Sequence, residues 1–350
     1  MVYQFQLMED FQHIQEYKKL KELKGGFKMK KIAIMGITAL LSISLFGKTI
    51  VLKMADNHAA DYPTVLGDME FSRLVKEKSK GKLKVEVYSG GQLGSEETTI
   101  EQVQFGAIDL VRTSLSPLAK YNEKLNVLML PYLYNSTEHM FKVLDGPIGD
   151  EFQTALIRNN MKGISWFDGG ARNFYNTKKE IKKVSDLKGM KIRVQDNELM
   201  MDLISVLGAS PTPMAFGEVY GALQTGVIDG AENNTPSYDS TSHFEVSKYF
   251  TLDGHIRVPE MILINNKKFN SLSDENKKII IEAGKEASLK QRKFWAEREE
   301  KSLAKVKSGG AKITELSDEE KKEFQKAVEK LYIKFASQYM EIVNKIKATK

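Results

Sequence analysis

Apolar and polar positions alternate along residues 49–113 in a way that predicts strands and helices in turn. Residues 83–88 show the two-residue period of a strand, and Pro63 is acceptable in the first turn of a helix. Strands are expected at 49–54, 83–88 and 107–113, and helices at 62–79 and 95–105. This β-α-β-α-β order predicts a mostly parallel sheet with covering helices.

A second α/β block is predicted further along the chain. Asn197 can cap a helix that ends before Gly208, because the apolar residues between them fall on one helical face. The other elements expected here are strands at 163–167, 171–176, 190–194, 227–231 and 258–265, a helix at 216–224 and a short helix after Pro236.

The carboxyl third is predicted to be helical. Ser273 can cap a long helix that is rich in Lys and Glu and reaches about Lys307. Ser317 and Glu320 fit a capping box at the start of another helix. Its expected buried stripe consists of Phe324, Val328, Leu331 and Phe335. The charge-rich faces of both helices are expected to be solvated.

An apolar run at 32–46 follows Met29 and two lysines. It is shorter than the ~20 apolar residues needed to cross a bilayer. A positive start and a short apolar middle are typical of a secretory signal peptide. We therefore expect a signal peptide at 29–47 and export to the periplasm. Residues 1–28 are interpreted as an extension upstream of the true start, and a buried helix is the alternative for the apolar run.

Composition excludes several classes of protein. The chain has no cysteine, so it has no disulfide, no Cys-based metal site and no cysteine for a lipid anchor. The formal charge is +6, but residues 1–47 carry seven lysines and only four acidic residues. No Arg/Lys block with interleaved aromatics is present, so we expect no nucleic-acid partner.

The sequence carries no local motif for catalysis. Phosphate-loop, dinucleotide-binding, Gly-x-Ser-x-Gly and His-Glu-x-x-His patterns are absent, and no two of the five His residues stand at metal-ligand spacing. We expect no cofactor, no metal and no enzymatic activity. An exported enzyme acting on acidic sugars stays an alternative, since a fold can bring distant residues together.

Two arginines are candidate ligand groups. Arg172 follows a Gly-Gly-Ala run at a strand start, and Arg193 lies in an apolar strand between Ile192 and Val194. A guanidinium offers a planar fork of donors that matches a carboxylate. The spacing alone leaves a surface position or a structural ion pair equally open.

Several ordered motifs resemble the DctP-type substrate-binding proteins of tripartite ATP-independent periplasmic (TRAP) transporters. They are the runs at 90–94 (Gly-Gly-Gln-Leu-Gly), 130–132 (Leu-Pro-Tyr), 189–194 (Gly-Met-Lys-Ile-Arg-Val), 208–216 (Gly-Ala-Ser-Pro-Thr-Pro-Met-Ala-Phe), 218–220 (Glu-Val-Tyr), 222–224 (Ala-Leu-Gln) and 228–233 (Ile-Asp-Gly-Ala-Glu-Asn). The resemblance extends from about residue 50 to the carboxyl end.

The resemblance implies an α/β fold with two lobes that close on a ligand, a long helix that spans both lobes and a helical carboxyl third. The implied boundaries are 48–170 for the first lobe, 171–257 for the second and 258–350 for a return to the first. It also implies a monomer that delivers its ligand to TRAP membrane subunits.

Site residues follow from the same resemblance. Arg193 falls on the family's carboxylate anchor, and Arg172 falls on a second basic contact found in members that bind acidic sugars. Asn233 is implied as a polar contact and Phe216 as an aromatic that packs on the ligand.

The ligand is predicted from the loops at the strand ends. His58, Glu96, Arg112 and Ser114 all lie where parallel strands end, which is where open α/β sheets bind ligands. These side chains suit several hydroxyls and resemble the set in uronate-binding members. We therefore expect a sugar acid such as glucuronate or galacturonate. A C4-dicarboxylate, sialic acid or another organic acid remains open, as does a sensing role in place of transport.

Overall fold

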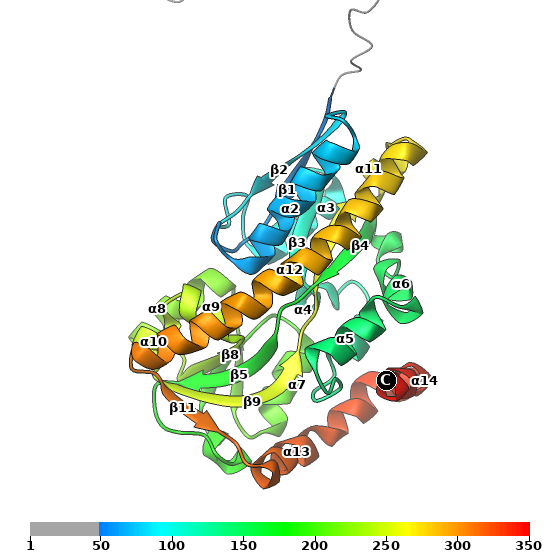
Figure 1. The fold of residues 1–350 in the computed structure, drawn as a ribbon. Coiled ribbons are helices and arrows are strands. Elements are labelled where there is room, and N and C mark those ends of the chain that lie inside the picture. The colour runs from blue at the N-terminus through cyan, green and yellow to red at the C-terminus, as the bar shows by residue number, and fades with distance from the viewer. Residues whose placement is uncertain (1–48) are drawn as a thin grey trace, which may run out of the picture. The chain divides into compact units, whose positions relative to one another are not determined.

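The computed structural model describes residues 49–350. The extension expected at 1–28 and the signal peptide expected at 29–47 lie outside these residues. Within the described range, no helix is both long enough and apolar enough to cross a membrane. This part of the chain is built around two β-sheets, named the first sheet and the second sheet below (Figure 1).

The first sheet has the strand order β2-β1-β3-β10-β4. Its strands are β1 (Ile50–Ala55), β2 (Leu83–Tyr88), β3 (Leu110–Ser114), β4 (Met161–Phe167) and β10 (Glu260–Asn265). Strands β2, β1 and β3 pair in parallel, as the alternating pattern predicts, whereas β10 runs antiparallel to both of its neighbours.

Helices α2 (Pro63–Lys78) and α12 (Asp274–Ser308) pack side by side against the first sheet (Figure 1). Phe71 of α2 and Ile280 of α12 enter one apolar cluster with Leu52 of β1 and Ile164 of β4. Helix α3 (Glu96–Phe105) begins at Ser95, whose side chain accepts a hydrogen bond from the backbone N–H of Thr98. This packing and this cap therefore fix the ends of β1 and β2, after which α2 and α3 begin.

The second sheet has the order β11-β9-β5-β8-β6-β7. Its strands are β5 (Ala171–Asn176), β6 (Lys191–Val194), β7 (Ser210–Pro213), β8 (Gly230–Asn233), β9 (Tyr249–Arg257) and β11 (Lys312–Glu315). Strand β5 is antiparallel to both neighbours. Three helices connect its strands: α7 (Glu198–Val206), α8 (Val219–Thr225) and α9 (Thr235–Ser240). Asn197 caps α7, as expected, and Gly208 follows it with φ +85°.

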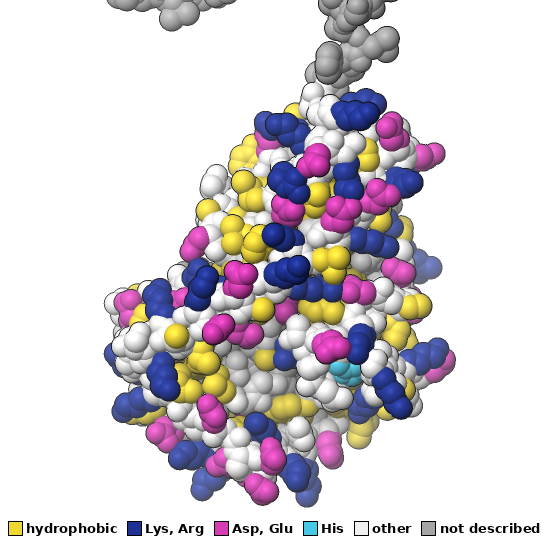
Figure 2. Space-filling view, in the orientation of Figure 1, with side chains coloured by type: hydrophobic (Ala, Val, Ile, Leu, Met, Phe, Trp, Pro, Cys, Tyr) yellow, Lys and Arg dark blue, Asp and Glu magenta, His cyan; other side chains and the backbone are white. Residues whose placement is uncertain are grey.

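The chain crosses between the two sheets after β4, after β9 and, through α12, between β10 and β11. Helix α12 spans both parts, because it contacts α2 and β4 on one side and α9 on the other. At the first crossing, Gly170 has φ +67°, and a Cβ there would lie 2.8 Å from the Trp295 ring of α12. Only glycine fits this backbone against the spanning helix. The exposed surface of α12 carries both charge signs (Figure 2).

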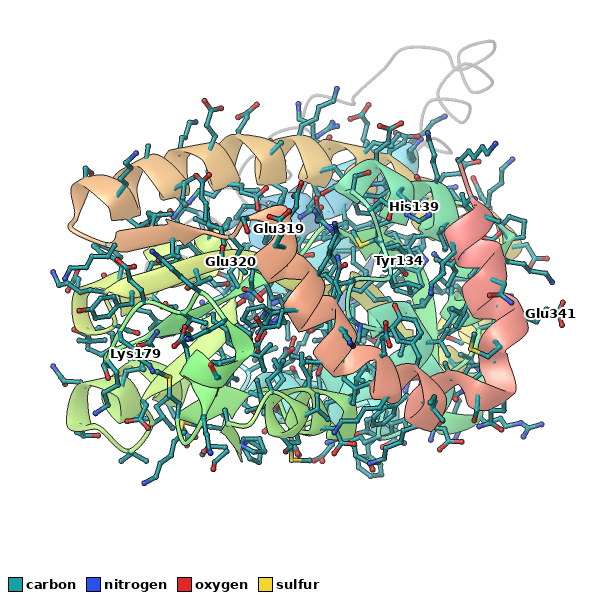
Figure 3. All side chains as sticks on the ribbon, turned by 90° about the horizontal axis from the view of Figure 1, so that it is seen from below. Tyr134, His139, Lys179, Glu319, Glu320 and Glu341 are labelled. Atoms are coloured by element: carbon teal, nitrogen blue, oxygen red, sulfur yellow. The ribbon has the colours of Figure 1, made fainter. Side chains whose placement is uncertain are left out.

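Helices α13 (Asp318–Ala336) and α14 (Met340–Ala348) form the carboxyl end. Ser317 and Glu320 make the expected capping box, and Phe324, Val328 and Leu331 are buried while Phe335 is partly buried. His139 of α5 (Thr137–Leu144) donates from Nε2 to the carbonyl of Ile346 at 2.9 Å, which links α5 to α14 (Figure 3).

The remaining helical segments complete the connections. They are α4 (Leu115–Leu118), α5 (Thr137–Leu144), α6 (Pro147–Gln153), α10 (His243–Val246), α11 (Asn266–Ser271) and the 3-10 turns η1 (Glu123–Met129), η2 (Ile157–Asn159), η3 (Val184–Leu187), η4 (Phe216–Glu218) and η5 (Ser337–Tyr339). Two α/β lobes, a long spanning helix and a helical carboxyl end confirm the expected fold class.

Several element predictions were wrong in detail. Strands β7, β9 and β11 were not predicted. Strand β8 begins at Gly230 rather than 227, because Gly226 ends α8 in the left-handed conformation and the chain needs three more residues to reach the sheet. Strand β11 pairs with β9 in the second sheet, a position that the expectation for 258–350 did not include.

Candidate functional site

A small cavity lies between the two lobes. All eight residues singled out in the sequence line it: His58, Glu96, Arg112, Ser114, Arg172, Arg193, Phe216 and Asn233. Five further residues line it too: Asn57, Gln195, Asn234, Ser237 and Glu260. The structure thus brings all the candidates together, while their contact with a ligand stays a prediction.

Strand geometry explains this convergence. His58 and Ser114 follow or end the parallel strands β1 and β3, and Glu96 begins α3. Arg172 lies near the start of β5, which is antiparallel to β8, so it meets Asn233 at the end of β8. Strand ends from both sheets therefore face the same cavity.

Arg193 is a buried cation that lacks a carboxylate partner. Its side chain lies in β6, and the residue is only 3% exposed. Nε and Nη2 donate to the carbonyl of Met214 at 2.9 and 2.6 Å. Among the described residues, no carboxylate lies within ion-pair distance of it, and Nη1 has no hydrogen-bond acceptor. Burial, with Arg172 adding to it, lowers the pKa of Arg193. A buried charge without a partner is costly, so the site is arranged for an anion.

Arg172 is held by Glu232. Its Nη2 donates to Oε1 and to the backbone carbonyl of Glu232, both at 2.8 Å, while Nε contacts Oε2. Nη1 donates to Oδ1 of Asn233 at 2.9 Å. Burial opposes the charge of Glu232, but Arg172 and His255 outweigh it and lower the pKa of Glu232 to about 2.

His255 lies behind Glu232 as seen from the cavity. It continues a series of alternating charges that runs from Arg172 through Glu232 and His255 to Asp253. Its Nδ1 lies 2.8 Å from Asp253, and its Nε2 lies 3.6 Å from Glu232. Burial acts to lower the pKa of His255, but Asp253 and Glu232 raise it to about 9. The imidazolium therefore sits between two carboxylates and stacks on Phe174 with 4.3 Å between ring centroids. Because His255 holds Glu232 in place, Glu232 in turn fixes the side chain of Arg172.

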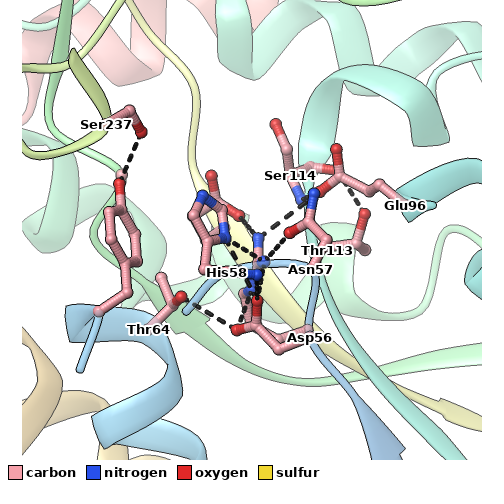
Figure 4. A network of polar contacts seen from close by, with 12 residues as sticks. Asp56, Asn57, His58, Thr64, Glu96, Thr113, Ser114 and Ser237 are labelled. Carbon is pink, nitrogen blue, oxygen red and sulfur yellow. Dashed lines mark hydrogen bonds and ion pairs between the residues drawn. The ribbon is translucent and has the colours of Figure 1, made fainter. Parts of the chain in front are cut away.

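Arg112 is surrounded by protein acceptors. Its Nε donates to Asp56 at 2.8 Å and its Nη1 to Glu260 at 2.6 Å. Nη2 donates to Asp56 and to Asn57, and Glu96 lies 3.5 Å from Nη1. Figure 4 shows Asp56, Asn57, His58 and Glu96 gathered in this network. Direct ligand contact by Arg112 stays a prediction, but the geometry favours a positioning role.

His58 is held as a neutral donor. Its Nδ1 lies 2.6 Å from Nη2 of Arg112 and 3.2 Å from Oδ1 of Asp56. Because Arg112 is the nearer group and can only donate, we assign Nδ1 as the acceptor and the proton to Nε2. Burial, followed by Arg112, lowers the pKa of His58 and keeps the ring uncharged. The ring stacks on Tyr62 with 4.0 Å between centroids and meets Phe216, from the other lobe, at 5.2 Å.

The polar groups on the two walls meet across the cavity. Glu96 accepts from the backbone N–H of Ser114 at 2.7 Å, and the Ser114 hydroxyl lies 3.5 Å from Oε1 of Gln195 on the other lobe. Tyr62 contacts Ser237 at 2.8 Å. These contacts hold the lobes in a closed arrangement and offer both donors and acceptors to hydroxyl groups.

The five lining residues that were not predicted differ in how clearly the sequence marked them as site residues. Gln195 directly follows β6 and Asn57 directly follows Asp56, so both stand at strand ends and the rule used for His58 would have found them. Glu260 is the first residue of the apolar strand β10, and its charge there was the signal that marked it. Asn234 and Ser237 had the signature of a helix cap, which Asn234 also forms.

The chain matches the family described as bacterial extracellular solute-binding protein, family 7 (DctP), over residues 54–338. It is 36% identical over 322 residues to a solute-binding protein of Chromohalobacter salexigens, which covers 92% of this chain and 95% of the relative.

Two crystal structures of TRAP periplasmic solute-binding proteins are also similar. The protein from Roseobacter denitrificans, with bound β-D-glucuronate, is 40% identical with a TM-score of 0.82, covering 86% of this chain and 100% of the other. The protein from a Bradyrhizobium species, in complex with α/β-D-galacturonate, is 41% identical with a TM-score of 0.82, covering 85% and 99%.

Proposed function

We propose that this chain, which belongs to the DctP family of bacterial extracellular solute-binding proteins, captures a uronate such as glucuronate or galacturonate in the periplasm for a TRAP transporter. Residues 29–47 serve as the signal peptide, and the chain delivers its ligand to the membrane subunits of the transporter. It acts by binding alone.

The observation that carries this proposal is the buried Arg193 with Nη1 directed at no acceptor of the described residues. A ligand carboxylate supplies the missing counter-charge. Because Met214 fixes the other edge of the guanidinium, the free edge is pre-oriented for a charge-assisted hydrogen bond.

Charge pairing favours a ligand with one carboxylate. Arg172 forms an ion pair with Glu232, and Arg112 forms ion pairs with Asp56 and Glu260. A second ligand carboxylate would therefore meet arginines that are already neutralised, which disfavours a C4-dicarboxylate.

The rest of the cavity suits hydroxyl groups. His58 offers Nε2–H, and Glu96 has an oxygen left after its bond to Ser114. Asn233 uses Oδ1 for Arg172 and the backbone N–H of Asn234, which leaves its amide donors for a ligand. Phe216 covers one face, as an aromatic does on a sugar ring. The uronates bound in the similar crystal structures fit this distribution.

Closure of the two lobes strengthens the binding of the ligand. The open lobes admit the ligand, its carboxylate meets Arg193, and closure removes water so that the charge-assisted bonds strengthen. The crossings after β4 and β9 are where the backbone turns between the two states.

The test is a binding screen of the purified mature chain against glucuronate, galacturonate, aldonates, C4-dicarboxylates and sialic acid, by thermal shift and then calorimetry. We expect micromolar or tighter binding of at least one uronate, with unchanged ligand after incubation. Tighter binding of succinate or malate than of any uronate would overturn the assigned ligand class, and turnover of a uronate would overturn the assignment as a binding protein.

A further inference from the structure

Glu260 is an acidic residue of the cavity wall that is hydrogen-bonded on one oxygen only. It lies in β10, opposite Ser114 of β3 and Phe167 of β4. Oε2 accepts from Arg112 at 2.6 Å. Among the described residues, no donor lies within hydrogen-bonding distance of Oε1. Water can satisfy this oxygen only while the cavity is wet.

The surroundings of Glu260 hold more negative than positive charge. Arg112 of β3 also serves both oxygens of Asp56, after β1, and it lies 3.5 Å from Glu96 of α3. Three carboxyl groups therefore share one guanidinium. A fourth, Asp68 of α2, is fully buried, and neither of its oxygens has a partner among the described residues.

The other titratable groups that face Glu260 do not relieve this imbalance. Tyr62 of α2 is neutral and bonded to Ser237. Arg172 of β5 is already paired with Glu232. His58 is neutral. Across the cavity Arg193 is also without a carboxylate partner among the described residues, but the proposed function assigns it to the ligand carboxylate. With ligand bound, no other cation of the described cavity lining is free to pair with a fully ionised cluster.

Proton binding resolves the imbalance at two of the four carboxyls. Burial raises the pKa of Asp68 well above its usual range, and the charge of Asp56 adds to this, so Asp68 stays protonated near neutral pH. Burial likewise raises the pKa of Glu260 to about 7, with Arg112 opposing and Glu96 adding. In an open, hydrated cavity the carboxyl of Glu260 returns toward its ordinary pKa of ~4.3.

We propose that Glu260 takes up one proton from solvent when the cavity closes on an anionic ligand, so that capture of the carboxylate is coupled to proton binding. This inference rests on the proposed function and assigns its pH dependence to one residue. The ligand brings a negative charge and displaces the water at Oε1. Protonated Glu260 removes one charge from the cluster and turns Oε1 into a donor for a ligand oxygen.

The sign of the effect follows from linkage. The closed, ligand-bound form holds more protons than the open form between the ordinary pKa of a Glu carboxyl, ~4.3, and the raised value. Affinity therefore falls as pH rises from the lower to the upper end of this window, by at most about tenfold per pH unit. A ligand carboxylate is itself ionised above pH 5, so it does not produce this trend.

Calorimetry of the mature chain with the uronate that binds best tests the proposal, with titrations in phosphate and in Tris at pH 6.5. The difference in heat between buffers of unlike ionisation enthalpy gives the number of protons exchanged. We expect an uptake of about 0.5–1 proton for the wild type. E260Q, which mimics the protonated acid, is expected to exchange close to none and to lose the pH dependence of its affinity.

The matched control is D68N, because Asp68 is expected to be protonated in both states, and it should exchange as many protons as the wild type. Uronate binding without proton uptake by the wild type overturns this proposal and leaves the proposed function intact. Uptake that persists in E260Q, or that disappears only in D68N, overturns the assignment to Glu260. Failure of all sugar acids to bind contradicts the proposed function itself.

Discussion

Replacing Arg193 by Ala should weaken uronate binding more than any other single change on the second lobe. The guanidinium is buried, two of its nitrogens are fixed on Met214, and its remaining edge is the part left for a carboxylate. Truncating one partner of a buried, hydrogen-bonded charge pair costs ~2–5 kcal/mol. At ~1.4 kcal/mol per factor of ten, the dissociation constant should rise about 30- to 4,000-fold.

Two further variants sharpen this prediction. Arg193→Lys keeps the charge but cannot donate to Met214 and to the ligand with one planar fork, so it should also bind at least about tenfold more weakly. Arg73→Ala is the matched control, because Arg73 lies on the surface of α2 and its ion pairs within residues 49–350 are with Glu70 and Glu77.

Isothermal titration calorimetry at pH 7 measures all three, and thermal unfolding without ligand verifies that each variant is folded. Arg73→Ala should bind like the wild type. A dissociation constant for Arg193→Ala within about threefold of the wild type would refute the reasoning that a ligand carboxylate completes this buried charge.

Three other predictions concern the scaffold. Gly170→Ala should lower the free energy of unfolding by more than ~1 kcal/mol, measured in urea, because the side chain would require φ +67° and meet Trp295; an unchanged midpoint would contradict this. The stabilising contribution of His255 should be complete below its unfolded pKa of ~6.5 and be lost as pH rises through about 9, so unfolding free energies of the wild type should decline over this window relative to His255→Gln; parallel curves would argue against a charged imidazole. Ser317→Ala removes the cap of α13 and should cost ~0.5–2 kcal/mol, and no change in urea stability would show that the cap is dispensable.

The sequence was most informative where local rules decide the structure. Asn197, Ser273 and Ser317 cap helices as predicted, because a cap depends on residues within one turn. Strand β9 was missed because Asp253 and Gly254 interrupt its apolar pattern. It is a strand because it pairs with β5 and β11, which are both distant from it in the chain.

The candidate site shows the same limit. Strand-end position and family resemblance named residues that all line the cavity, but they could not tell how charges pair within it. In the sequence, Arg193 was the expected carboxylate anchor and Arg112 was a further candidate for ligand contact. The structure separates them. Asp56 and Glu260, from segments distant in the sequence, pair with Arg112, whereas among the described residues Arg193 donates only to the Met214 carbonyl.

A crystal structure of the chain with bound glucuronate or galacturonate would test carboxylate capture most directly. We expect the ligand carboxylate within hydrogen-bonding distance of Nη1 of Arg193, ~2.7–2.9 Å, with sugar hydroxyls toward His58 and Glu96. A carboxylate seated on Arg172 or Arg112, with Arg193 left unpaired in the closed cavity, would contradict the proposed role of Arg193.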